Sequence, residues 1–115
     1  MTNFYKLANN CQTTLKTDMD SSQTTMEVDD NSTFPASFPF ILTIWDSYIY
    51  GSNNASLDPT MEIVEVTSLV SGTTYNITRE MEGTSGSEHF IGQTVAMLIT
   101  AAIITQLQTA INALE

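Results

Sequence analysis

The residues that could do chemistry lie together in one stretch, NITREMEGTSGSEHFIG, which spans residues 76–92. It holds Arg79, Glu82 and His89, and these include the only arginine and the only histidine of the chain. A carboxylate beside an imidazole can transfer protons, and an arginine can hold an anion, so a small hydrolase is one hypothesis for this set. Because no serine or cysteine nucleophile with a plausible local partner accompanies the three residues, we favour a structural role and expect no enzymatic activity.

The strand that carries Arg79 supports the structural interpretation. The segment TTYNITREM, residues 73–81, has the alternation of a strand. Tyr75, Ile77, Arg79 and Met81 are two residues apart and therefore share one face. Arg79 is therefore expected at the edge of the core, paired with a carboxylate, while His89 bonds the intervening turn. The partners that we expect for Arg79 are Glu62, Glu65 or Glu82.

A second candidate is an acidic segment, TDMDSSQTTMEVDD, that has part of the spacing of a calcium loop. Its alternate oxygen-bearing residues are Asp18, Asp20, Ser22 and Thr24. The sixth position of such a loop needs glycine but holds Gln23. We therefore expect a solvated hairpin edge that discourages strand pairing between molecules, with no bound metal or cofactor.

Composition excludes several classes of partner. The chain has 115 residues and a formal net charge of -10, so it would repel a nucleic acid backbone. Its longest apolar stretch, VAMLITAAII, is too short to span a bilayer, and no secretory signal is visible at the N-terminus. The single Cys11 cannot form an internal disulfide and is interpreted as an incidental thiol. We expect neither a nucleic acid nor a membrane among the partners.

Hydrophobic periodicity predicts a mainly β protein: a compact antiparallel β sandwich or barrel with one C-terminal α-helix. Residues 23–28 alternate as a half-buried strand, and FILTIWDSYIY, residues 40–50, has the apolar faces of a buried strand. The polar segment 51–60 would join this strand antiparallel to residues 61–69, and Ser71 and Gly72 would make the next tight turn. From residue 94 the spacing becomes helical.

These elements divide the chain into three parts. We expect an N-terminal arm at residues 1–12, a β domain at 13–98 and a C-terminal helix at 99–115. The helix carries large apolar residues at positions a and d of two heptads, and almost no charge elsewhere. Such a helix could fold back onto its own sheet, but we favour assembly with other copies or with another protein. The assembly residues are Ile104, Leu107, Ile111 and Leu114.

Several motifs of the chain, taken in order, resemble a β module of tailed-bacteriophage virion proteins. The family pattern is Glu-Ile-Val-x-Val-Thr, a turn, Thr-Val-x-Arg-Gly-x-x-Gly-Thr, a spacer, and His-x-x-Gly-x-x-Val. The resemblance covers roughly residues 13–114. One departure is Glu80, which stands where the pattern has glycine and predicts a different backbone conformation in the turn after Arg79. The matching residues are Glu62, Ile63, Val64, Val66, Thr67, Thr78, Arg79, Gly83, Thr84, His89, Gly92 and Val95.

The resemblance implies a noncatalytic structural domain of a tail fibre, baseplate, adaptor or capsid-decorating protein. It implies a location in the virion, which is assembled in the host cytoplasm, other virion proteins as partners and a homo-oligomer, with a trimer favoured. In this interpretation Arg79, Gly83, Thr84, His89 and Gly92 build a structural hairpin. The alternative function is a carbohydrate-binding module, for which exposed Trp45, Tyr48 and Tyr50 would supply a stacking platform.

Overall fold

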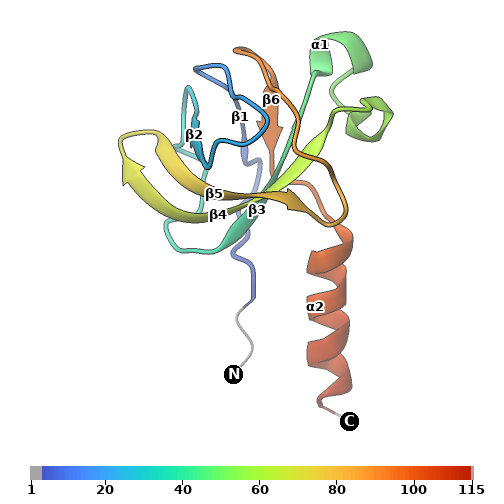
Figure 1. The fold of residues 1–115 in the computed structure, drawn as a ribbon. Coiled ribbons are helices and arrows are strands. Elements are labelled where there is room, and N and C mark those ends of the chain that lie inside the picture. The colour runs from blue at the N-terminus through green and yellow to red at the C-terminus, as the bar shows by residue number, and fades with distance from the viewer. Residues whose placement is uncertain (1–3, 115) are drawn as a thin grey trace.

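A computed structural model describes residues 4–114, in which six antiparallel strands form one curled sheet and a helix leaves it at the C-terminal end (Figure 1). This confirms the predicted mainly β class with one C-terminal helix. The strands are β1 Gln12–Thr14, β2 Thr25–Glu27, β3 Phe40–Trp45, β4 Glu62–Ser71, β5 Thr74–Met81 and β6 Thr94–Ala96. The helices are α1 Ser47–Tyr50, the short 3-10 turn η1 Ala55–Leu57, and α2 Ala101–Asn112.

The sheet has the strand order β1-β6-β3-β4-β5-β2, and its two edge strands come together. Just beyond them, Leu15 and Val28 form an isolated antiparallel bridge. The Lys16 N–H donates to the Glu27 carbonyl and the Asp29 N–H to the Thr14 carbonyl, each at 3.0 Å. The sheet therefore curls upon itself, with apolar side chains facing the interior and few unpaired edge groups. The core lies inside this curl and includes Leu15, Met26, Val28, Phe40, Leu42, Ile44, Val64, Val66, Tyr75, Ile77 and Val95.

The long central hairpins agree with the predicted pairing. Strand β3 pairs antiparallel with β4, with Leu42 opposite Val64. Strands β4 and β5 are joined by a two-residue turn at Gly72 and Thr73, where Gly72 has a φ of 55°. A φ in the left-handed region is easy for glycine and suits a tight hairpin turn, which explains the Ser-Gly signal in the sequence.

The prediction of a strand through residue 50 is wrong in its second half. The strand ends at Trp45, and Ser47–Tyr50 form the short helix α1. Asp46 causes the change because its Oδ1 accepts the N–H groups of Tyr48 and Ile49, which caps the start of the helix. Apolar residues on both faces fit a single helical turn as well as a strand, so the sequence pattern did not separate the two.

The helical spacing that we expected from residue 94 begins too early, although the predicted helix at 99–115 contains α2 Ala101–Asn112. Thr94–Ala96 form β6, which lies between β1 and β3, and all three residues are buried. The apolar faces of a central strand are both covered, so its sequence shows no alternation. The helix begins only after Thr100.

Helix α2 runs away from the sheet, with the N-terminal segment of the chain beside it (Figure 1). No residue of α2 is buried, so it does not fold back as a lid over the core. The Tyr5 N–H donates to the Gln106 side-chain oxygen at 3.0 Å, which ties the N-terminal arm to the helix. Among the described residues, no helix has the length and apolar character needed to cross a membrane. The proposed assembly residues Ile104, Leu107, Ile111 and Leu114 are all exposed.

Candidate functional site

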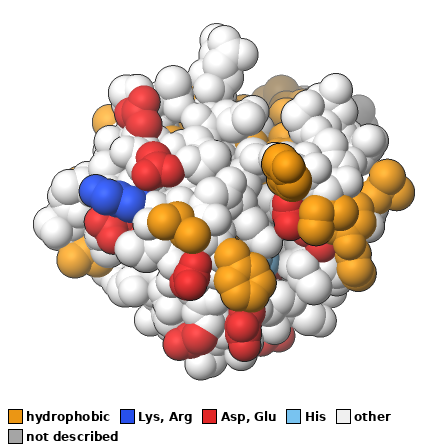
Figure 2. Space-filling view, turned by 90° about the horizontal axis from the view of Figure 1, so that it is seen from above, with side chains coloured by type: hydrophobic (Ala, Val, Ile, Leu, Met, Phe, Trp, Pro, Cys, Tyr) orange, Lys and Arg blue, Asp and Glu red, His pale blue; other side chains and the backbone are white. Residues whose placement is uncertain are grey.

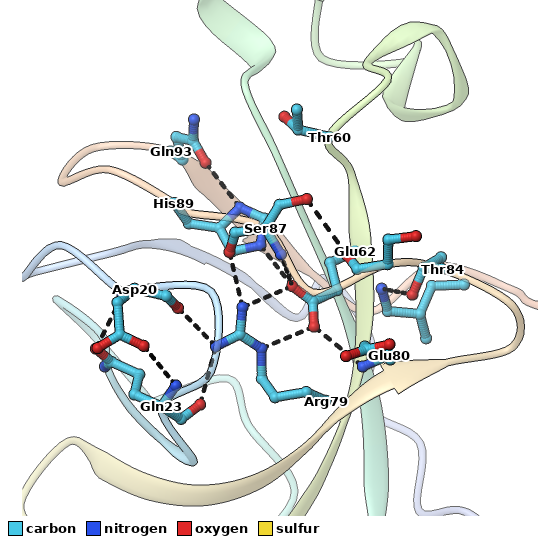
Figure 3. A network of polar contacts seen from close by, with 12 residues as sticks. Asp20, Gln23, Thr60, Glu62, Arg79, Glu80, Thr84, Ser87, His89 and Gln93 are labelled. Atoms are coloured by element: carbon cyan, nitrogen blue, oxygen red, sulfur yellow. Dashed lines mark hydrogen bonds and ion pairs between the residues drawn. The ribbon is translucent and has the colours of Figure 1, made fainter.

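Arg79 lies at the centre of a network of polar contacts that joins two loops to the sheet (Figure 3). Its Nε donates to Glu62 Oε2 at 2.7 Å and its Nη2 to Glu62 Oε1 at 2.8 Å. Nη2 also donates to the Ser87 carbonyl, and Nη1 donates to the carbonyls of Asp20 and Gln23. All five guanidinium N–H groups thus have an acceptor, which leaves none for a ligand.

The Glu62 carboxylate is equally well satisfied. Besides Arg79, it accepts the N–H groups of Glu80 at 3.0 Å and Ser87 at 3.2 Å, and the His89 Nε2–H at 2.9 Å. Burial raises the pKa of this carboxyl, but the hydrogen bonds from Arg79, His89, Glu80 and Ser87 outweigh burial and lower the pKa to about 2. Glu62 is therefore an anion held inside the protein. Of the three partners predicted for Arg79, the structure selects Glu62.

A bulge in β5 aims Arg79 at this carboxylate. Ile63 pairs with Met81 and Glu65 with Thr78, so β5 has two residues, Arg79 and Glu80, opposite one residue of β4. Glu80 has a φ of 58°, in the left-handed region that favours glycine. The family pattern has glycine at this position, and Glu80 adopts the conformation that glycine favours. The different backbone conformation that we predicted after Arg79 is therefore not found.

His89 is fully buried and belongs to the same network. Its backbone exchanges hydrogen bonds with Met19, and its Nδ1 lies 3.2 Å from the Gln93 side-chain oxygen. The ring therefore contacts Glu62 and Gln93, and not the turn as we expected. The isolated bridge between Met19 and His89 joins the segment between β1 and β2 to the loop between β5 and β6. Because β5 and β6 are not neighbours in the sheet, this loop does not connect two paired strands, contrary to the hairpin that we predicted.

The acidic segment that resembles a calcium loop has a different task. Asp20 Oδ1 accepts the N–H groups of Ser22 and Gln23, which folds the segment into a tight turn. This turn presents the Asp20 and Gln23 carbonyls to Arg79. Asp18 Oδ1 accepts the Ile91 N–H at 2.7 Å. Across residues 4–114, no group of three or more metal-ligating side chains is found.

Glu82, the third residue of the catalytic hypothesis, lies apart from the other two. Its Oε1 accepts the Ala102 N–H at 2.9 Å and so satisfies one free donor in the first turn of α2. It also lines a hollow with Leu98, Ile99 and Thr100, which does not include His89. The sequence set Arg79, Glu82 and His89 is therefore not one site, because Glu62 takes the place of Glu82.

The remaining predicted hairpin residues lie in the loop beyond β5 and in the turn before β6. Gly83 and Gly92 have φ values of 82° and 90°, which glycine adopts without strain. Thr84 Oγ1 donates to the Met81 carbonyl and accepts the Ile63 N–H. Trp45, by contrast, is only 1% exposed and its indole N–H donates to the Gly51 carbonyl, so it cannot stack on a sugar.

The arrangement can hold loops in place, but it offers no open surface for a reaction. Glu62 and His89 have no exposed side-chain surface, and the Arg79 side chain is 7% exposed. General acid and base catalysis requires contact with substrate, and these groups contact each other. The sequence reasoning missed the Glu62–His89 contact, whose only sequence signal is that Glu62 shares the inward face of its strand with Val64 and Val66.

In comparisons with known proteins, no family model and no curated protein matches this chain.

Proposed function

We propose that this chain is a noncatalytic structural protein of a tailed-phage virion. In this proposal it is an attachment, adaptor or decoration module that binds other virion proteins and assembles as a homo-oligomer, with a trimer favoured. The proposal starts from the resemblance of roughly residues 13–114 to the virion β module, and the contacts of Arg79, Thr84 and His89 support a structural role for these matching residues.

The observation that carries the proposal is the closed Glu62–Arg79–His89 network. All five N–H donors of Arg79 and both carboxylate oxygens of Glu62 form hydrogen bonds within the protein. The residues that could have taken part in catalysis therefore stabilise loops. Residues whose polar atoms are bonded within the protein suit a structural role better than catalysis, which requires contact with a substrate. The exposed apolar face of α2 supports assembly, because the free energy falls when a partner covers such a face.

The test is the composition of purified particles. Virions of the phage that encodes the chain would be separated on a density gradient, and the chain would be quantified by mass spectrometry against the major capsid protein. A fixed number of copies per particle, in a multiple of three, is the expected result. A nonstructural enzyme of the same phage serves as the control that must not co-sediment. A chain that stays with this enzyme in the soluble fraction would contradict the proposal.

The copy number also separates the possible locations. A tail, neck or baseplate adaptor surrounds one axis of the particle and would be present in few copies. A head-decorating protein would be present in proportion to the capsid protein.

A further inference from the structure

A hollow of about 460 Å³ lies between α1 and residues 90–93. Figure 1 shows α1 at the end of the sheet opposite to α2. Asp46, Tyr48 and Ile49 line it from one side, and residues 90–93 line it from the other. Figure 2 looks onto this end and shows hydrophobic side chains next to acidic ones. Neither the buried network nor the exposed helix accounts for this surface.

Large apolar side chains around the hollow are unusually exposed. Tyr48 is 98% exposed, Ile49 70%, Phe90 52% and Ile91 67%. Single exposed apolar residues are ordinary, but four around one concave surface are typical of a binding site. Two of the four, Tyr48 and Phe90, are aromatic, and aromatic residues are enriched at protein interfaces.

The backbone on both sides of the hollow is held in place. The Ile91 N–H donates to Asp18 Oδ1 at 2.7 Å, and the Gly92 N–H donates to the Leu15 carbonyl at 2.9 Å. On the other side, Asp46 caps α1, and its own N–H donates to Asp58 Oδ2 at 2.8 Å. A binding surface that is already ordered loses little conformational entropy on association.

Charge then selects the kind of side chain that fits. Asp46 Oδ1 caps α1, whereas no hydrogen bond engages its Oδ2 within the described part of the chain. Asp18 adds a second carboxylate beside Ile91, and the whole chain has a net charge of -10. A cation near aromatic rings gains cation–π energy from Tyr48 and Phe90, and a charge-assisted hydrogen bond from Asp46. Arginine fits better than lysine because its planar guanidinium both stacks and donates in parallel.

We propose that the hollow between α1 and residues 90–93 binds an arginine side chain presented by another virion protein. This proposal rests on the proposed function, which supplies the class of partner. The aliphatic Ile49 and Ile91 favour a protein over a saccharide, because they can pack against apolar neighbours of the arginine but give a sugar neither a stacking face nor a hydrogen bond.

The experiment is a nuclear magnetic resonance titration of the ¹⁵N-labelled full chain with the capped peptide Ac-Leu-Arg-Leu-NH2. The expected result is saturable shifts confined to the amides of residues 46–49 and 90–93. Ac-Leu-Gln-Leu-NH2 is the uncharged control and should produce much smaller shifts. Binding should weaken as sodium chloride is added, because salt screens an exposed ion pair.

The matched variant is Asp46→Asn. Asparagine caps a helix about as well as aspartate, so α1 should stay folded while the charge in the hollow is lost. Binding of the arginine peptide should weaken about fivefold, which is the factor expected for a partly exposed ion pair. Glu82→Gln changes an exposed residue that contacts Ala102 of α2 and does not line the hollow, so it should leave binding unchanged.

Three outcomes would overturn the proposal. The first is the absence of shifts at residues 46–49 and 90–93, and the second is equal binding of the arginine and glutamine peptides. The third is saturable shifts at these residues with N-acetylglucosamine or galactose oligomers but not with the arginine peptide, which would assign the hollow to a carbohydrate. None of these results changes the copy number in purified particles, so the proposed function is judged separately.

Discussion

Arg79 and Glu62 form a two-point ion pair, with Nε–Oε2 and Nη2–Oε1 distances of 2.7 and 2.8 Å, and neither side chain has more than 7% of its surface exposed. Glu62 begins β4 and Arg79 lies near the end of β5, so the pair joins the two longest strands. Because the remaining Arg79 donors bind carbonyls of residues 20, 23 and 87, the same side chain also holds two loops. We therefore expect this ion pair to contribute to the stability of the fold and to the order of both loops.

Replacement of Arg79 by alanine should destabilise the protein by about 3 kcal/mol, because it strands a buried carboxylate and leaves three carbonyls without a donor. Arg79→Lys should fall between alanine and wild type, since an ammonium group cannot bond both carboxylate oxygens and the loop carbonyls together. Urea denaturation monitored by Trp45 fluorescence would measure both variants. Lys16→Ala, which removes an exposed base, is the control and should be close to wild type. An Arg79→Ala midpoint equal to that of wild type would refute the structural role.

Acid should unfold the protein through Glu62. The pKa of this carboxyl is about 2 in the folded protein and near 4.5 when it is unperturbed, so the folded state binds the proton less readily. The stabilisation is complete above pH 4.5, declines below it and is lost as the pH falls through 2. By the linkage relation it amounts to about 3 kcal/mol at most.

The measurement is the free energy of unfolding between pH 7 and pH 2, for wild type and for Glu62→Gln. The variant should be less stable at neutral pH, because Arg79 keeps its charge without a counter-charge. Its stability should change less than that of wild type between pH 4.5 and pH 2. Parallel curves for the two proteins would show that another carboxylate controls acid unfolding.

Glu80 should be better replaced by glycine than by alanine. Its φ of 58° costs an L-residue about 1 kcal/mol, a cost that glycine avoids. Both substitutions remove the same side chain beyond Cβ, so their difference reports the backbone alone. We expect Glu80→Gly to be more stable than Glu80→Ala by about 1 kcal/mol in thermal or urea unfolding. If alanine were the more stable, the β5 bulge would not require a left-handed residue.

Much of the fold followed from periodicity, but contacts that depend on register did not. The alternation of Tyr75, Ile77 and Arg79 is enough to turn Arg79 inward, and Ser-Gly before β5 is enough to place the hairpin turn. Glu62 faces the interior with Val64 and Val66, whereas Glu65 lies on the other face of β4, so alternation alone separates these two carboxylates. The approach of Arg79 to Glu62 also depends on the bulge opposite Val64, and a bulge leaves no signal in a polar and apolar pattern. Glu65 instead accepts the Tyr5 hydroxyl at 2.9 Å, from a segment 60 residues away.

The two wrong elements have related causes. Thr94–Ala96 form a short strand that is covered on both faces and therefore shows no alternation of its own. Together with the apolar residues that follow, it has the spacing of a helix. In residues 46–50 the decisive feature is one capping aspartate, which outweighs the strand propensity of Tyr48 and Ile49. Exposure of Tyr48 and burial of Trp45 follow from that cap, because the chain turns away from the sheet directly after Trp45. A sequence pattern detects hydrophobic faces but not the single hydrogen bond that ends a strand.

Helix α2 should be the element that assembles. Its a and d residues are exposed, and the helix Ala101–Asn112 contains no charged residue that would repel an identical helix. An isolated helix of this length is marginal in water, so packing against a partner is expected to stabilise it. In parallel coiled coils, isoleucine at a with leucine at d favours a dimer of helices. The preference for a trimer comes from the resemblance to the virion β module.

Two charges placed on the apolar face should abolish this assembly. We expect the full chain to have the solution mass of a trimer, and the double variant Leu107→Glu/Ile111→Glu to have that of a monomer, by light scattering coupled to size exclusion. Thr105→Glu/Thr109→Glu adds the same charge at exposed positions outside the a and d face, and should remain oligomeric. Because no residue of α2 is buried, a chain that ends at Leu98 should keep the folded sheet as a monomer. If the full chain is itself a monomer and α2 binds no other virion protein, assembly through the helix is wrong.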